Sequence, residues 1–254
     1  MTPGLREYEF TLPVGYTDPA GRVHRRAVLQ KMRGHEEALL YDPALSSGRL
    51  VTELLRHCLV RLGELPEVTA DVASGLYSAD RNYLVLELRR ITLGDSLEAS
   101  YACPGCGGET RVQEELGKLQ IQRLEEGASP EAMLVQLEDG YQDREGNTHT
   151  ELRLRLPRGV DEELVTRLAQ GDPLRMRDVL ILRCIESFGT LPRAALESYG
   201  LKILRDLTLG DRRRIYQALD TRSPGVDFRR RVRCAHCGTH YNAVLEASGF
   251  FALG

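Results

Sequence analysis

Two Cys-x-x-Cys pairs, one in each half of the chain, constrain the fold more than any other feature of this sequence. The first pair is Cys103 and Cys106, and the second pair, Cys234 and Cys237, follows at an offset of 131 residues. Four thiolates complete the tetrahedral coordination of a zinc ion, whereas two thiolates supply half of it. One half-site in each half of the chain predicts that a single metal ion joins the two halves.

Four blocks of sequence recur in the same order in the two halves. The segment Gly15–His24 shares five of its ten positions with Gly140–His149. The other matched blocks are Cys58–Pro66 with Cys184–Pro192, Asp80–Arg81 with Asp211–Arg212, and the two cysteine pairs themselves. Because the blocks keep their order and only small insertions separate them, the pattern indicates a tandem duplication of one module of roughly 120 residues.

Each module is expected to be of the α+β class and to contain a hairpin, helices and a zinc knuckle, in that order. The first module is expected over residues 8–123 and the second over residues 133–254, with a linker over 124–132. Turn residues between apolar strands, and apolar residues on one helical face, define the elements. These are hairpins at 8–29 and 133–156, helices at 50–62 and 176–188, and two helices with Asp80 and Asp211 as N-cap residues.

The two cysteine pairs have the features of zinc knuckles. Each pair lies between predicted strands, and a glycine, Gly107 or Gly238, follows its second cysteine, where backbone amides can point at sulfur. The sequence therefore predicts a zinc ribbon with one structural zinc ion per chain. Its four ligands are expected to be Cys103, Cys106, Cys234 and Cys237. The alternatives left open are disulfides, a redox pair, a metal site lost during evolution, and an iron ion in place of zinc.

Other cysteines and histidines are expected to be structural. Cys58 and Cys184 lie at matched positions on apolar helix faces, which is typical of small core residues. His236 and His240 lie close to the second knuckle and are alternative ligands, but the first knuckle has no counterpart of either. Four thiolates already complete the site, so we expect neither histidine to bind the metal.

No catalytic or cofactor-binding constellation is recognised in the sequence. His24 and His149 both follow a hairpin turn, and we expect each to stabilise its turn at the surface. The acidic pairs Glu36-Glu37 and Glu162-Glu163 recur at predicted helix starts, where carboxylates favour the helix dipole. The chain is therefore predicted not to be an enzyme.

Composition adds few limits. The net charge of −3 does not favour nucleic acid or a membrane surface as the partner. The chain has no apolar run of transmembrane length and no apolar signal segment at residues 1–7, which predicts a cytoplasmic protein without membrane insertion. The arginine-rich strand 229–233 supports an alternative interpretation, a zinc-ribbon nucleic-acid-binding adaptor that contacts phosphates.

Several short motifs have a familiar order along the chain. They are Leu12–Tyr16 with Asp18 and Gly21, Asp80–Leu84, Thr92–Asp95 before Cys103 and Cys106, and Asp211-Arg212 before Cys234, Cys237 and Phe250-Phe251. In this order the chain resembles the T-even-type phage baseplate hub assembly proteins, a family found in phage tails and in phage-tail-like contractile injection systems. The resemblance covers most of the chain. It implies a structural or assembly role at the baseplate and no enzyme activity.

The partners implied by the resemblance are hub, spike or wedge proteins of the tail, with no small-molecule substrate. The segments outside the repeated core, residues 1–7 and Phe250–Leu253, are candidates for contacting them. A pair of phenylalanines at an exposed chain end would be an apolar anchor for a partner's groove. The alternative is that the two rings dock on the chain's own ribbon.

Overall fold

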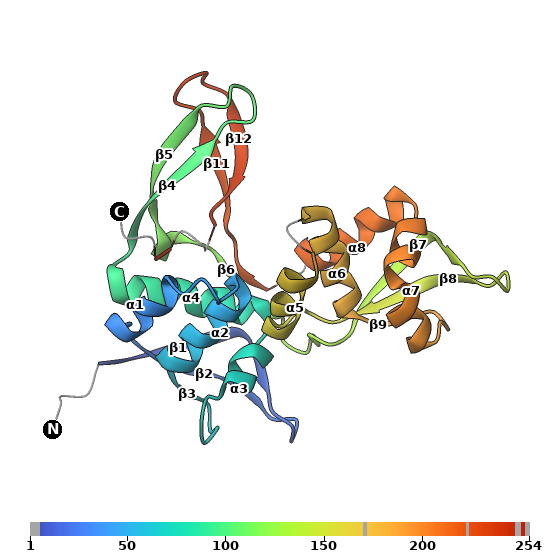
Figure 1. Ribbon diagram of the computed structural model, residues 1–254, viewed down its shortest axis with the longest axis horizontal. Helices are drawn as coiled ribbons and strands as arrows, with labels where there is room; N and C mark the ends of the chain where they lie inside the picture. Colours follow the sequence, from blue (N-terminus) through green and yellow to red (C-terminus); the bar gives the residue numbers. More distant parts are fainter. Residues whose placement is uncertain (1–5, 170–171, 222–223, 247–249, 252–254) are drawn as a thin grey trace.

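The computed structural model describes residues 6–169, 172–221, 224–246 and 250–251. Two lobes of mixed helix and strand lie side by side, and a pair of long hairpins rises from the first lobe (Figure 1). The fold is α+β, as predicted, with helices and several small antiparallel sheets.

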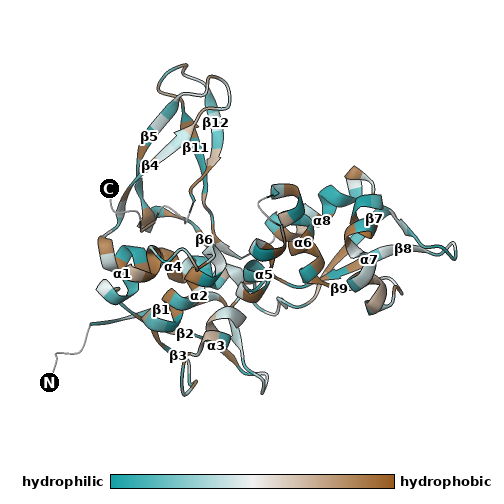
Figure 2. Ribbon diagram, in the orientation of Figure 1, coloured by the Kyte–Doolittle hydropathy of each residue, from teal (hydrophilic) through white to brown (hydrophobic). Residues whose placement is uncertain are grey.

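The first lobe packs four helices against a three-stranded sheet with strand order β1-β2-β3. Its elements are β1 (Glu7–Thr17), β2 (Val23–Gln30), α1 (Gly34–Leu40), α2 (Ser47–Cys58), β3 (Leu59–Leu62), α3 (Ala70–Gly75) and α4 (Ser78–Leu93). Helix α4 is buried on both sides, and apolar residues recur along it (Figure 2). Leu84 and Leu88 belong to the core of the lobe, whereas Val85 and Leu86 belong to the core beneath the hairpins. This helix therefore connects the lobe to the raised hairpins.

The second lobe contains a sheet with the equivalent strand order, β7-β8-β9. Its elements are β7 (Met133–Gln142), β8 (Thr148–Leu154), α5 (Gly159–Ala169), α6 (Pro173–Cys184), β9 (Ile185–Phe188), α7 (Arg193–Asp206) and α8 (Leu209–Thr221). The two sheets also share their irregularities. The register between the first two strands shifts after Thr11 in one lobe and after Gln136 in the other, and the same offset of 125 relates the two hairpins in sequence.

The predicted helices 50–62 and 176–188 are each too long at their C-terminal end. Helix α2 ends at Cys58 and α6 ends at Cys184, and the next four residues form the short strands β3 and β9. Leu59 and Leu62 are both buried, so their spacing of three residues also suits a helix. Residues 59–62 form a strand because they pair with β2, which is distant in sequence.

The prediction that Asp80 and Asp211 are N-cap residues is wrong. Both lie inside the first turn of their helices, α4 and α8, and their carboxylates reach across to the irregular part of the first strand. Asp80 accepts hydrogen bonds of 2.8 Å from the backbone N–H groups of Val14 and Gly15. Asp211 accepts three such bonds, of 2.7 to 3.0 Å, from residues 138–140. A strand irregularity frees N–H groups from the ladder, and a carboxylate at a helix start satisfies them.

The two aspartates are expected to respond oppositely to pH. Burial raises the pKa of Asp80 to about 6, whereas the backbone N–H groups around Asp211 outweigh its burial and hold its pKa below the ordinary value. The contribution of Asp80 to stability should therefore fall as pH rises from about 4 through about 6, and that of Asp211 should fall as pH drops below about 4.

Urea unfolding of Asp80→Ala and Asp211→Ala, each compared with the wild type at the same pH, measures both trends. At pH 7 the Asp80→Ala loss should be about 2–4 kcal/mol, because two buried N–H groups lose their acceptor. The Asp211→Ala loss should be smaller, since Glu138 and Asp139 are exposed and water can replace the carboxylate. Parallel pH trends for the two variants would contradict the assignment.

Candidate metal centre

Two hairpins, one from each half of the chain, stand together on the first lobe (Figure 1). The first consists of β4 (Ser96–Ala102) and β5 (Glu109–Glu115), and the second of β11 (Arg229–Arg233) and β12 (His240–Val244). Below them, β6 (Ile121–Gln122) pairs with β10 (Gly225–Val226), so the second half of the chain returns to the first beneath the hairpins. Each Cys-x-x-Cys pair lies in the loop at a hairpin tip.

The two loops fold in the same way. In the first, the N–H of Gly107 donates to the carbonyl of Cys103 at 2.8 Å, and in the second the N–H of Gly238 donates to Cys234 at 3.0 Å. Both glycines have positive φ, 72° and 74°, which explains why the position needs glycine. The N–H groups of His236 and Cys237 point at the Cys234 sulfur, 3.4 and 3.5 Å away. The N–H of Cys237 contributes most to a lowered pKa of the Cys234 thiol.

The four sulfur atoms form a compact cluster. All of them lie within 4.8 Å of one another. Across the two hairpins, the Cys103 and Cys237 sulfurs are 3.7 Å apart and the Cys106 and Cys234 sulfurs 3.6 Å apart. A tetrahedron with Zn–S bonds of about 2.3 Å has edges of about 3.8 Å. These separations fit a shared metal ion and are far longer than the S–S bond of about 2.05 Å in a disulfide.

The surroundings give the cluster one closed side and one open side. Cys103 and Cys234 are buried, whereas Cys106 and Cys237 are exposed. The hydroxyl of Tyr241 donates to the carbonyl of Tyr101 at 3.0 Å beneath the cluster, which ties one hairpin to the other. His236 does not join the cluster, because its Nε2 lies 3.0 Å from the carbonyl of Glu109. The arrangement suits a structural ion with four protein ligands.

The expectation of an exposed phenylalanine anchor is wrong for Phe250. Its ring is fully buried and packs edge-on against Phe228, with ring centroids 5.9 Å apart. This is the alternative in which the ring docks on its own ribbon. Phe251 is half-buried, and residues 252–253, like residues 1–5, lie outside the described part of the chain. In the N-terminal candidate segment 1–7, Glu7 forms an ion pair of 2.5 Å with Arg61 of the chain itself.

Cys58 and Cys184 are core residues, as predicted. Both thiols are buried in the lobes, and burial raises the pKa of each to about 12. Neither belongs to the sulfur cluster at the hairpin tips.

The two matched histidines stabilise the hairpin turns, as predicted, but they do so from buried positions. The Nε2 of His24 lies 3.0 Å from the Asp18 carboxylate, and that of His149 lies 3.0 Å from Asp143. Only 6% of His24 and 4% of His149 is exposed. The rings are covered by the chain at Gly63 and Gly189, where an added Cβ would lie within 2.6 Å of a ring nitrogen. The predicted surface position is therefore wrong.

Two of the arginines in strand β11 pair with acidic groups of the chain. Arg229 pairs with Asp227 at 2.8 Å and Arg230 with Glu114 at 3.1 Å. Arg231 and Arg233 are exposed on the outer face of the strand. Half of the strand's arginines thus have a structural partner, which limits the surface open to phosphate.

Sequence reasoning missed a buried cation between the lobes. Arg81 has no exposed surface and donates to the Thr52 hydroxyl at 2.9 Å and to the carbonyls of Ala73 and Gly48, both at 2.8 Å. Its carboxylate partner comes from the other lobe, where Glu162 lies 3.2 Å from its Nε. The pair Glu162-Glu163 lies near the start of α5, as predicted, but its carboxylates bridge the lobes.

The matched arginine of the second lobe is paired within that lobe. Arg212 donates to Asp178 at 2.6 Å and to the carbonyl of Leu204 at 2.7 Å. Asp178 occupies the repeat position of Thr52, which has no charge. The sequence signal for these buried arginines was the Asp-Arg pair that recurs in both halves. Because we interpreted the aspartate of each pair as an N-cap, the role of the arginine was missed.

Comparison with known proteins gives one match. A protein family described as T4 bacteriophage base plate protein matches residues 46–252 of the chain. No curated protein and no solved structure matches. Within the described residues, no helix is both long enough and apolar enough to span a membrane.

Proposed function

The chain belongs to the T4 bacteriophage base plate protein family, and from this premise we propose that it is a structural component or assembly factor of the baseplate of a contractile phage-tail-like injection particle. The observation that carries the proposal is the match over residues 46–252, which includes both cysteine pairs. Its partners are hub, spike or wedge proteins, and assembly takes place in the cytoplasm. The protein acts through surfaces and not as an enzyme.

The metal in this proposal is one structural zinc ion per chain, bound by Cys103, Cys106, Cys234 and Cys237. The sulfur separations of 3.6 and 3.7 Å across the hairpins support it. A bound zinc ion would cross-link the two hairpins. It would have no catalytic role, since four thiolates leave no coordination position open for a substrate. The two hairpins then form a zinc ribbon that joins the halves of the chain.

The architecture in this proposal is a tandem duplication. The modules are residues 8–123 and 133–254, separated by the linker 124–132. Equal strand order, matched register shifts and the matched contacts of Asp80 and Asp211 support it. A duplicated chain gives two similar lobes that can face different neighbours in the particle.

Purification of the affinity-tagged chain from cells that express its native operon tests the function. Mass spectrometry should find hub, spike or wedge proteins in the eluate, and they should persist after nuclease treatment. Their absence while particles assemble would contradict the proposal. The double variant Arg231→Glu/Arg233→Glu tests the alternative of a nucleic-acid adaptor: loss of a salt-dependent nucleic-acid shift in this variant would favour that alternative.

A further inference from the structure

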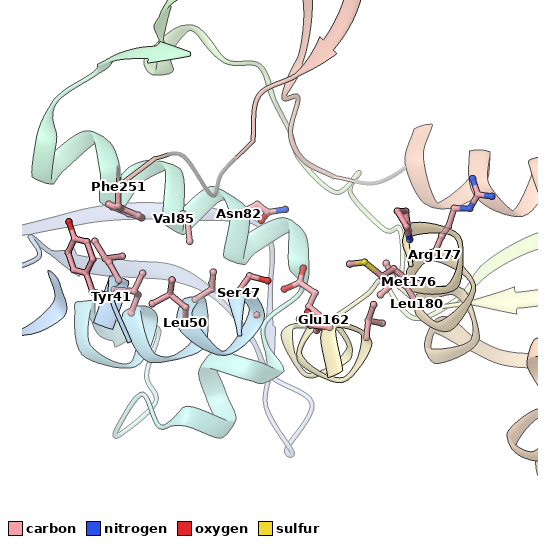
Figure 3. A pocket seen from close by; sticks show the side chains of 17 residues that line it. Tyr41, Ser47, Leu50, Asn82, Val85, Glu162, Met176, Arg177, Leu180 and Phe251 are labelled. Carbon is pink, nitrogen blue, oxygen red and sulfur yellow. Dashed lines mark hydrogen bonds between the residues drawn. The ribbon is translucent and has the colours of Figure 1, made fainter. Parts of the chain in front are cut away.

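An apolar groove lies between the two lobes. Helices α2 and α4 of the first lobe and α5 and α6 of the second line it, and its volume is about 910 Å³ (Figure 3). Its walls are mostly aliphatic, with Leu50 and Val85 on one side and Met176 and Leu180 on the other. Tyr41 at its rim is 66% exposed. An apolar hollow of this size on a protein surface indicates a binding site.

The two sides of the groove are built from matched positions of the repeat. Leu50 in α2 corresponds to Met176 in α6, and Leu54 corresponds to Leu180, each at an offset of 126. Each lobe thus turns the equivalent face of its equivalent helix toward the same space (Figure 3). Residues of both lobes line the groove, so its full outline depends on how the lobes are docked.

The charge that the groove presents is negative. Glu162 points into it, and the other charged lining residue, Arg177, is turned away so that its guanidinium lies 3.9 Å from the centre of the Tyr216 ring (Figure 3). One carboxylate oxygen of Glu162 accepts from the buried Arg81 at 3.2 Å. A basic group of an occupant would complement this carboxylate from the groove side.

We propose that this groove binds an amphipathic helix of a baseplate protein, with an apolar stripe at i, i+3/i+4 and i+7 and a lysine or arginine facing Glu162. The inference rests on the proposed function, which supplies the class of partner. A helix with a diameter of about 10–12 Å and a pitch of about 5.4 Å fills 910 Å³ with roughly two turns. Two turns present the three or four apolar side chains typical of helix-in-groove recognition.

A helix fits this groove better than an extended segment. Apart from Tyr41 and Phe251, the residues that line it lie on helices, whose backbone groups are hydrogen-bonded internally, and no strand in the described part of the chain presents a sheet edge to it. An extended segment would leave its own N–H and C=O groups unpaired against aliphatic side chains, which costs free energy. A helix satisfies these groups itself.

The groove also continues the contact between the lobes. Helix α5 packs on α2 beside it, where the Thr52 hydroxyl donates a hydrogen bond to the Glu163 carboxylate. An occupant would touch both lobes and stabilise their docking. Binding of a partner and the arrangement of the lobes are therefore coupled.

Site-specific photo-crosslinking in particles assembled from the native operon tests the inference. Tyr41 and, separately, Met176 are replaced by p-benzoyl-phenylalanine, with Tyr199 as the control, since Tyr199 is 63% exposed and does not line the groove. We expect positions 41 and 176 to crosslink to one peptide of one tail protein, with apolar residues at helical spacing and a basic residue. Position 199 should not crosslink to that peptide.

Three outcomes would overturn the inference: no crosslink while baseplate proteins still co-purify, crosslinks to a second copy of this chain, or crosslinks to a segment without helical periodicity. The first leaves the proposed function intact, whereas absence of every baseplate protein overturns both. As a second measurement, Met176→Glu should reduce the recovered tail protein at least tenfold, because it places a carboxylate in the apolar wall of the groove. Leu209→Glu, at a position 84% exposed and outside the groove, should leave recovery unchanged.

Discussion

Cys103→Ser is expected to abolish tight metal binding and to lower the free energy of unfolding by several kcal/mol. The reason is that binding of a structural zinc ion contributes about 10–16 kcal/mol to folding in small zinc domains, and loss of one thiolate removes a large part of it. In the proposed site the ion joins hairpin tips that are 131 positions apart in sequence, so its loss removes the cross-link between these tips. Urea unfolding and metal analysis of the reduced protein measure the effect.

Cys58→Ala is the matched control. It also removes a buried thiol, but from the core of the first lobe, so the variant should lose stability while it retains one zinc per chain. Replacement of the ion by cobalt should give the visible absorption of a tetrahedral thiolate site in the wild type and in Cys58→Ala, but not in Cys103→Ser. Two zinc ions per chain, or none in the reduced wild type, would refute the shared site.

The hairpins and the sulfur cluster were predictable because their signals are local. Turn residues such as Asp18 and Gly21 define the first hairpin, observed as β1 and β2 over residues 7–30. The Cys-x-x-Cys spacing defines each knuckle, and the occurrence of one pair in each half implied that the pairs meet. The sequence could not give the ends of α2 and α6, because Leu59 suits a helix and a strand equally and only pairing with β2 decides.

The contacts between the lobes were not predictable for a different reason. Arg81 reads as a surface residue of a capped helix, yet it is fully buried. Its partner Glu162 is 81 positions away and belongs to the other lobe. The repeated Asp-Arg motif marks the arginine. That its partner comes from the other lobe follows from Thr52, which is uncharged where the second half has Asp178.

Arg81→Ala is expected to lower the free energy of unfolding by about 3–5 kcal/mol, because it removes a buried cation whose partners cannot all be satisfied by water. The carbonyls of Gly48 and Ala73 lose their donor, and Glu162 loses its ion pair. Arg212→Ala should cost a similar amount. The two variants should differ in where the chain is loosened. Amide hydrogen exchange should become faster in α2 and α5 for Arg81→Ala, but in α6–α8 for Arg212→Ala.

Moving the carboxylate partner of Arg81 from the second lobe to the first tests whether the ion pair stabilises the first lobe or the docking of the two lobes. Glu162→Gln/Glu163→Gln should loosen α5 from α2, because Arg81 is left with neutral acceptors. Adding Thr52→Asp gives Arg81 the in-lobe partner that Asp178 gives Arg212, so stability should recover while α5 remains exchange-labile. Protection of α5 in this triple variant equal to the wild type would show that apolar contacts alone hold the lobes together.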